Sequence, residues 1–146
     1  MTTPRFDVAA LGNAIVDVLA RAEDSDLARE GMVKGSMTLI DEARAEALYP
    51  VIGSTVVVSG GSAANTCAGV ASLGGKTAFI GKVRNDALGT SFTHDIRAAG
   101  VHFETAAATW GPATASSTIL VTPDGERTMN TFLGASQHLQ IGRAHV

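Results

Sequence analysis

The chain has 146 residues, of which 45% are hydrophobic and 17% charged, and its formal net charge is −3. This length suits one domain with a buried core, and the composition excludes a disordered chain. The eleven Lys and Arg residues are scattered, so we expect no nucleic-acid partner. No apolar run reaches the roughly twenty residues of a membrane helix, and no signal-peptide pattern opens the chain, so we expect a cytoplasmic protein with no membrane contact.

Two extended segments open the chain. Residues 6–11 form an apolar, partly β-branched run that predicts a strand, and Gly12 interrupts it. Residues 13–19 can continue as a strand in which Asn13 and Asp17 share one face and apolar side chains share the other. Two interpretations of this segment remain open. Either Asn13 caps a turn and Asp17 is solvated at a strand edge, or both line a ligand cleft.

Short helices and a further extended segment follow. Residues 25–31 predict a helix, residues 35–40 an extended piece, and residues 41–49 a second helix capped by Asp41. We expect the buried stripe of this second helix to consist of Ala43, Ala47 and Leu48.

Residues 56–89 form the stretch around which the chain is organised, with the pattern strand, glycine turn, helix, strand and turn. Gly60 and Gly61 follow a β-branched run, and their missing side chains allow a ligand to lie against the main chain. The helix that begins near Ser62 points free amides at this place. Asn65, in its first turn, offers a donor and an acceptor to neighbouring hydroxyls of a polyol. The arrangement favours a sugar-like ligand.

The one cysteine, Cys67, lies among small apolar residues of this helix. A single cysteine excludes an internal disulfide and a cysteine-built zinc site, and we expect a core residue rather than a nucleophile. Residues 86–99 predict a further helix with an apolar stripe. His94 and Asp95 fall off that stripe, and we expect them on a solvated face, because no Cys or Ser nucleophile is placed to use them.

Residues 114–120 and 126–132 flank a Pro-Asp-Gly turn and predict a β-hairpin. Alternation along its first strand predicts one polar face, with Ser116 and Thr118, and one apolar face, with Ser117 and Ile119. Arg127, just past the turn, is either a solvated hairpin charge or a ligand contact.

Residues 141–146, with the sequence IGRAHV, follow no periodic pattern. The nucleotides ATC GGA AGA GCA CAC GTC encode them, and this is the start of a common sequencing adapter. We therefore expect a non-native tail and assign no function to His145.

Together these motifs resemble the N-terminal half of the ribokinase-like (PfkB) carbohydrate kinases, which include ribokinase, fructokinase and adenosine kinase. The most specific match is GGSAAN at residues 60–65 with the glycine-rich segment 81–89, in the order and spacing of the family's N-terminal signature. GNAIVD at residues 12–17 resembles the family's substrate-binding first strand. The resemblance covers residues 6–139 and favours the ligand-cleft interpretation of the first segment.

This resemblance implies an α/β fold, in which residues 1–140 form an incomplete ribokinase-like doubly wound sheet with a small β lid. The segments after Asp17 and around residues 115–131 would supply the lid strands, with a small-molecule sugar or nucleoside bound between lid and sheet. Asp17 would bind sugar hydroxyls, and the paired glycines would allow close approach. The implied substrate-binding residues are Asn13, Asp17, Gly60, Gly61, Asn65 and Arg127.

The family transfers the γ-phosphoryl group of ATP to a sugar hydroxyl with the help of Mg²⁺. Its catalytic aspartate belongs to a Gly-Ala-Gly-Asp-type motif in the C-terminal half, and no such motif occurs here. We therefore expect no catalytic residue and no metal site in this chain. ATP and Mg²⁺ are expected for the full-length enzyme, with neither bound by this fragment alone.

Ser62 stands where ribokinase-type members carry lysine, and this choice resembles the adenosine-kinase-like branch. Residues 122–127 resemble the same branch, so adenosine is the first expected substrate and a ribose- or fructose-like sugar the second. One alternative is a non-catalytic sugar-binding or lid-mediated dimerisation module, with a homodimer formed through the lid. A nicotinamide-dinucleotide-binding domain is disfavoured, because such a domain carries a Gly-x-Gly-x-x-Gly motif and only Gly12 of that motif is present here. Because half of a doubly wound domain leaves an apolar edge, we expect self-association.

Overall fold

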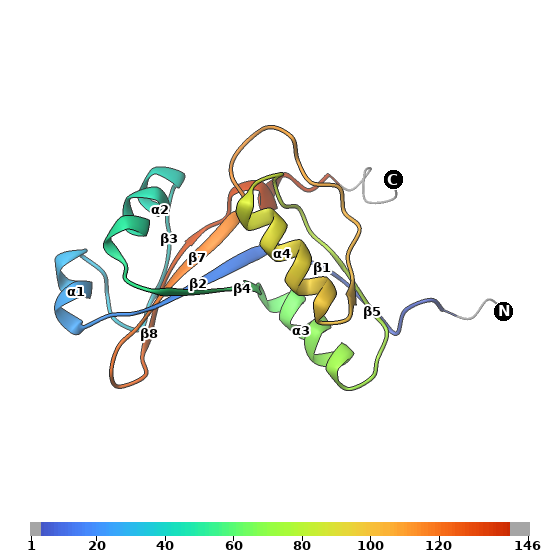
Figure 1. Cartoon of the computed structure of the whole chain (residues 1–146), viewed down its shortest axis with the longest axis horizontal. Helices are drawn as coiled ribbons and strands as arrows, with labels where there is room; N and C mark the ends of the chain where they lie inside the picture. Colours follow the sequence, from blue (N-terminus) through green and yellow to red (C-terminus); the bar gives the residue numbers. More distant parts are fainter. Residues whose placement is uncertain (1–3, 141–146) are drawn as a thin grey trace.

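The computed structural model describes residues 4–140, so the expected non-native tail at residues 141–146 lies outside the described residues. Two open sheets and several short helices make up the fold, which Figure 1 shows. Sheet A is parallel, with strand order β1 (Val8–Leu11), β5 (Thr77–Ile80), β6 (Val101–His102). Sheet B, which we call the lid sheet, has the order β3 (Met37–Leu39), β8 (Arg127–Phe132), β7 (Ala115–Val121), β2 (Ile15–Arg21), β4 (Thr55–Gly60).

The helices and turns lie close to where the sequence predicts them. Within residues 4–140 the α-helices are α1 (Asp24–Arg29), α2 (Glu42–Leu48), α3 (Ser62–Ser72) and α4 (Ala87–Ala98), with short 3₁₀ helices at Tyr49–Val51 and Gly134–His138. The Asp-Gly hairpin is confirmed, since β7 and β8 pair antiparallel. The central stretch is divided between the sheets: β4 pairs with β2 in the lid sheet, whereas β5 pairs with β1 in sheet A. The expected α/β fold with a separate lid is therefore confirmed.

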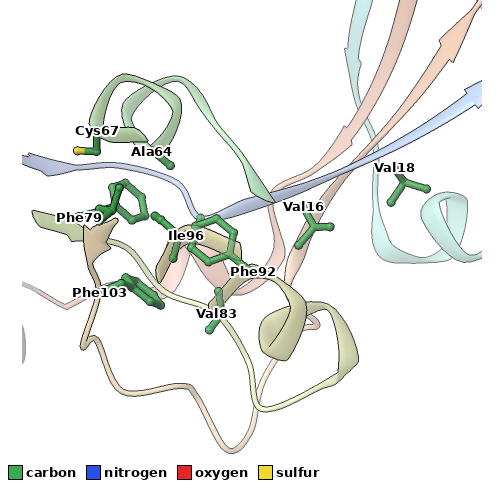
Figure 2. Close-up of a cluster of buried hydrophobic side chains, with 11 residues drawn as sticks. Val16, Val18, Ala64, Cys67, Phe79, Val83, Phe92, Ile96 and Phe103 are labelled. Atoms are coloured by element: carbon green, nitrogen blue, oxygen red, sulfur yellow. The ribbon is translucent and has the colours of Figure 1, made fainter. Parts of the chain in front are cut away.

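An aromatic cluster holds sheet A to its helices, as Figure 2 shows. Phe79 of β5, Phe92 of α4 and Phe103 after β6 are each at most 2% exposed. Their ring centroids lie 5.4 to 6.0 Å apart, which is the range for favourable aromatic pairs. Cys67 of α3 belongs to the same core, and burial raises the pKa of its thiol. The expectation of a core cysteine rather than a nucleophile is thus confirmed.

The two faces of strand β2 differ as its alternating sequence predicts. Val16, Val18 and Ala20 are buried, and they pack toward α4 and toward a small cluster around Leu27 of α1. Asp17 lies on the opposite face of the same strand and is half-buried. One face of the lid sheet therefore packs against helices, and the opposite face, which carries Asp17, is open.

Two packing expectations are wrong. Ala43 and Ala47 are exposed, and only Leu48 of the predicted stripe is buried, since a methyl group buries too little apolar area to set the orientation of a two-turn helix. The second wrong expectation concerns strand β7, which does not alternate between a polar exposed face and an apolar buried face. Its residues 117–120 are all buried, because β7 is an inner strand between β2 and β8.

Candidate functional site

A single row of side chains crosses the open face of the lid sheet at Asp17. The strand pairings align Asp17 with Val58 of β4 on one side and with Ser117 of β7 on the other. Ser117 in turn aligns with Thr131 of β8, and Thr131 with Leu39 of β3. Residues in register share a face of the sheet. We call these five residues the Asp17 row: Leu39, Thr131, Ser117, Asp17 and Val58.

The Asp17 row is polar at its centre and apolar at both ends. The hydroxyls of Ser117 and Thr131 lie 2.9 Å apart and share a hydrogen bond, and both residues are buried. Leu39 and Val58 at the ends are exposed. Such a row suits a ligand with a hydroxyl-bearing part and a flat apolar part, because each part meets a matching surface.

The carboxylate of Asp17 is the group of this row that has no hydrogen-bond donor from the protein. Within residues 4–140 it accepts no hydrogen bond, although the residue is half-buried. Burial raises the pKa of the Asp17 carboxyl above its usual value, and the positive charge of Arg127 opposes this shift without cancelling it. A half-buried carboxylate without donors is expected to take them from a ligand, and neighbouring sugar hydroxyls are donors of the right kind.

The backbone packing of the protein itself requires glycine at positions 60 and 61. A Cβ atom at Gly60 would lie 2.6 Å from Oδ1 of Asp17, so the carboxylate occupies the space that a side chain would fill. Gly61 has φ of +93°, and a Cβ there would lie 2.6 Å from the carbonyl oxygen of Asn13. The glycines therefore let β2 approach the start of α3, and they place Asp17 beside that helix end.

Most of the sequence-predicted residues meet at this place. The main chains of Asn13 and Gly61 are in close approach, and the Asn65 amide donates to the Gly61 carbonyl oxygen at 2.9 Å within α3. The Asn13 and Asn65 side chains are exposed and make no hydrogen bond to another described residue, so both are free for a ligand. Arg127 stands apart: it lies on the Asp17 face of β8, four residues along the strand from Thr131.

Helix α4 ties the lid sheet to sheet A through a carboxylate near each end. Asp86 caps α4 by accepting from the Gly89 amide at 2.8 Å, and it also accepts from the Thr114 amide at 2.9 Å and the Thr114 hydroxyl at 2.7 Å. Thr114 directly precedes β7. At the other end, Asp95 accepts from the Ser59 amide of β4 at 3.2 Å. The expected solvated position is thus correct for His94 and wrong for Asp95, because the edge strand β4 offers it an amide.

A cavity of about 480 Å³ lies elsewhere, between residues 105–112 and the segment 135–140, and Lys82 and Trp110 are among its lining residues. The Lys82 ammonium donates to the Ala106 carbonyl oxygen at 2.6 Å, so this lysine supports the loop that borders the cavity. Residues 4–140 include no helix long and apolar enough to cross a membrane. Over the same residues, no three His, Cys, Asp or Glu side chains gather closely enough to share a metal ion.

The four partners of Asp17 in its row were not identified from the sequence. Their alternation within each strand was visible. The alignment of Val58 with Asp17 depends on the antiparallel pairing of β2 with β4, and that of the other three depends on the parallel pairing of β2 with β7, about one hundred residues later in the chain. A two-residue Asp-Gly turn would have aligned Ser117 with Phe132. The observed loop is residues 123–125, which shifts the register by one residue and aligns Ser117 with Thr131. No local signal indicates Leu39.

A family model described as pfkB family carbohydrate kinase matches residues 8–142. Among solved structures, an adenosine kinase from Sinorhizobium meliloti is 56% identical with a TM-score of 0.89, and the match covers 96% of this chain and 43% of that one. A probable sugar kinase from Rhizobium etli is 52% identical with a TM-score of 0.90, covering 97% of this chain and 43% of that one. An adenosine kinase from Schistosoma mansoni, in complex with adenosine, is 21% identical over 93% of this chain and 40% of its own, and its TM-score of 0.81 shows a shared fold.

No curated protein matches the chain. The chain spans less than half the length of the solved structures that it resembles.

Proposed function

We propose, from the premise that this chain belongs to the pfkB family of carbohydrate kinases, that it is the substrate-binding part of an ATP-dependent nucleoside or sugar kinase. The observation that carries the proposal is the Asp17 row, in which a carboxylate without a protein donor stands between a hydroxyl pair and the exposed Val58. Kinases of this family use ATP, generally with Mg²⁺.

The proposed ligand contacts follow from the chemistry of each residue. Two neighbouring ribose hydroxyls would donate to Asp17, with Asn13 and Asn65 supplying further hydrogen bonds. The exposed Val58, which is in register with Asp17, would pack against a purine base, which a bare sugar lacks. Adenosine is therefore the first candidate, and a ribose- or fructose-like sugar is the second. Two solved structures above 50% identity are an adenosine kinase and a probable sugar kinase, in keeping with both candidates.

The phosphoryl-transfer step is assigned to the part of a full-length kinase that this chain does not span. The carboxylates of residues 4–140 do not form a cluster that fits Mg²⁺, and the sequence lacks the family's catalytic Gly-Ala-Gly-Asp-type motif. The chain's own residues bind and orient the substrate, and positioning of this kind supplies much of the rate enhancement in phosphoryl transfer.

Isothermal titration of the chain with adenosine, ribose and fructose tests the proposal. We expect one adenosine per chain, bound more tightly than either sugar. Replacing Asp17→Asn should weaken adenosine binding by about 10- to 100-fold, because hydrogen bonds to a charged group contribute about 1.5–3 kcal/mol. Glu46→Gln, which removes a charge from the exposed face of α2, is the matched control and should bind normally. Saturable binding that ignores Asp17→Asn, or no binding of any of the three, would contradict the proposal.

A second candidate is a non-catalytic sugar-binding module that dimerises through the lid sheet. The exposed apolar side chains Met37, Leu39, Val56 and Val58 on its open face favour this candidate. It predicts a concentration-dependent dimer in light scattering that Val56→Lys disrupts. A monomer at all concentrations that still binds adenosine would remove it. The cytoplasmic location expected from the sequence remains a prediction.

A further inference from the structure

A second cavity, of about 570 Å³, lies along helix α4 on the side away from the buried Phe92 and Ile96. We call it the α4 groove. Two arginines line it: Arg84, from the segment before α4, and Arg97, from the last turn of the helix. The connection between β6 and β7, orange in Figure 1, passes beside α4 and contributes Ala107. The α4 groove includes no residue of the Asp17 row, and the proposed function makes no use of it.

Main-chain carbonyl groups hold both guanidinium groups in place. Nη1 of Arg84 donates to the carbonyl oxygen of Gly111 at 2.5 Å, and Nε of Arg97 donates to that of Phe103 at 2.9 Å. A guanidinium has five N–H donors, so each arginine keeps donors for a further acceptor. Because one hydrogen bond already restricts each side chain, a ligand that binds there orders less of it, and less entropy is lost.

The positive charge of the α4 groove is not balanced by the protein. No carboxylate of residues 4–140 lies within ion-pair distance of either guanidinium. The two carboxylates of this region have other partners. Asp86 accepts from the Thr114 amide and hydroxyl, whereas Asp95 accepts from the Ser59 amide and lies 3.2 Å from Nδ1 of His94. In a chain with a net charge of −3, this groove is a local site for an anion.

The two arginines belong to opposite ends of the α4 groove. The first turn of α4 packs on the main chain of Arg84, since a Cβ atom at Gly89 would overlap the Arg84 carbonyl oxygen. Thr90, His94 and Arg97 follow at spacings of four and three residues, so they lie on one face of the helix. Seven residues of α-helix span about 10 Å. A ligand that meets both guanidinium groups must therefore carry negative charge along a comparable length.

We propose that the α4 groove binds a polyphosphate chain, such as that of a nucleoside triphosphate or an inorganic polyphosphate. One end of the chain would meet Arg84 and the other Arg97, because guanidinium groups bind phosphate oxygens through paired hydrogen bonds. The exposed side-chain amide of Asn85 adds a donor at the Arg84 end. The hydroxyls of Thr90 and Thr93 add none, since both donate to carbonyl groups of their own helix turn. A single phosphate would leave one guanidinium without its anion.

Isothermal titration of the chain with tripolyphosphate, orthophosphate and ATP tests the proposal, at low ionic strength and without Mg²⁺ or adenosine. We expect one tripolyphosphate per chain, bound about tenfold more tightly than orthophosphate, because a second guanidinium adds charge-assisted hydrogen bonds. Arg84→Gln and Arg97→Gln should each weaken tripolyphosphate binding by about tenfold for the same reason. Arg21→Gln is the matched control: it removes the same charge from the exposed end of β2 and should bind normally.

The outcomes separate the proposal from general attraction of anions. Equal binding of tripolyphosphate and orthophosphate, or equal weakening by Arg21→Gln and Arg97→Gln, would overturn it. ATP bound as tightly as tripolyphosphate would identify a nucleotide as the source of the chain, and weaker ATP binding would identify inorganic polyphosphate.

NMR titration of the parent chain with tripolyphosphate covers the case in which an arginine variant fails to fold. The amides of Asn85, Arg97 and Ala107 should shift and saturate, and a response confined to other residues would overturn the proposal. Asp17→Asn should bind tripolyphosphate as the parent does. A chain that binds tripolyphosphate but no adenosine would therefore reject the proposed function and leave this inference standing.

Discussion

Sheet A and the lid sheet differ in role: the first forms the core, and the second carries the candidate binding site. The covered face of sheet A packs on three buried phenylalanines and supplies the core. The lid sheet carries the Asp17 row on its open face, where a carboxylate is left without protein donors. Substitutions in the first region should therefore act on stability, and substitutions in the second should act on binding. The paired glycines and α4 lie between the two regions and should affect both.

The largest effect is expected from the aromatic core. Phe92→Ala removes a fully buried ring from the centre of the cluster, and such truncations destabilise proteins by about 3–5 kcal/mol. Urea unfolding followed by circular dichroism measures this change. Leu73→Ala, at an exposed position, should leave the urea concentration at the unfolding midpoint unchanged. A Phe92→Ala chain as stable as the parent would show that the core lies elsewhere.

The next effect concerns Gly60, where the two regions meet. Gly60→Ala places a methyl group on the Asp17 carboxylate, and we expect a loss of about 1–3 kcal/mol in unfolding free energy together with weaker adenosine binding. Gly69→Ala is the matched control. It lies in α3 with open space around its Cβ position, so it should stabilise the chain by about 0.5–1 kcal/mol. The idea fails if the two substitutions change stability in the same direction.

The carboxylate of Asp86 should couple the two regions. Asp86→Asn keeps a good helix cap, but its amide group replaces the oxygen that accepts from the Thr114 amide, so we expect a loss of about 1–2 kcal/mol. Asp41→Asn makes the same change at the cap of α2. There, among residues 4–140, the carboxylate accepts only from the Arg44 amide, and the change should be below about 0.5 kcal/mol. Equal melting temperatures of the two variants would argue against the coupling.

The smallest effect on stability is expected from Asp17→Asn, which should stabilise the chain rather than destabilise it. Burial raises its pKa in the folded state, so the charged form destabilises the fold at neutral pH, and this penalty disappears as pH falls through the folded pKa. Asp17→Asn should therefore melt slightly higher than the parent at pH 7, by less than about 1 kcal/mol because solvent screens a half-buried group. The difference should shrink at pH 4. A less stable variant at pH 7 would mean that Asp17 supports the fold.

The same carboxylate predicts the pH dependence of binding. Ligand hydroxyls that donate to Asp17 favour its charged form, so adenosine affinity should fall as pH drops through the pKa of Asp17. Titrations at several pH values between 7 and 4 measure this fall. In Asp17→Asn the profile should be flat.

The sequence predicts the features that depend on neighbouring residues in the chain. The glycine pair, the position of Asn65 in the first turn of α3 and the outward face of Asp17 all follow from local patterns, and the structure confirms their positions. The apolar spacing of Leu88, Phe92 and Ile96 likewise predicts the inner face of α4. Residue type and period are sufficient for such features.

Features that depend on long-range pairing were missed. Ser117 and Thr131 reach Asp17 because β7 lies parallel to β2, and Asp95 is half-buried because β4 is an edge strand of the lid sheet. No pattern within one segment reports the strand order of a sheet. The roles of Arg127 and Asn13 in binding remain predictions, since their positions are established and their contacts with a ligand are not.

The central claim is that the Asp17 row binds the substrate, and an NMR titration of the ¹⁵N-labelled chain with adenosine tests it most directly. The account predicts saturable shift changes at the amides of Gly60, Gly61, Ser117 and Thr131, with the Trp110 indole unchanged. Shift changes confined to the cavity lined by Trp110 and Lys82, or no saturable change, would contradict it.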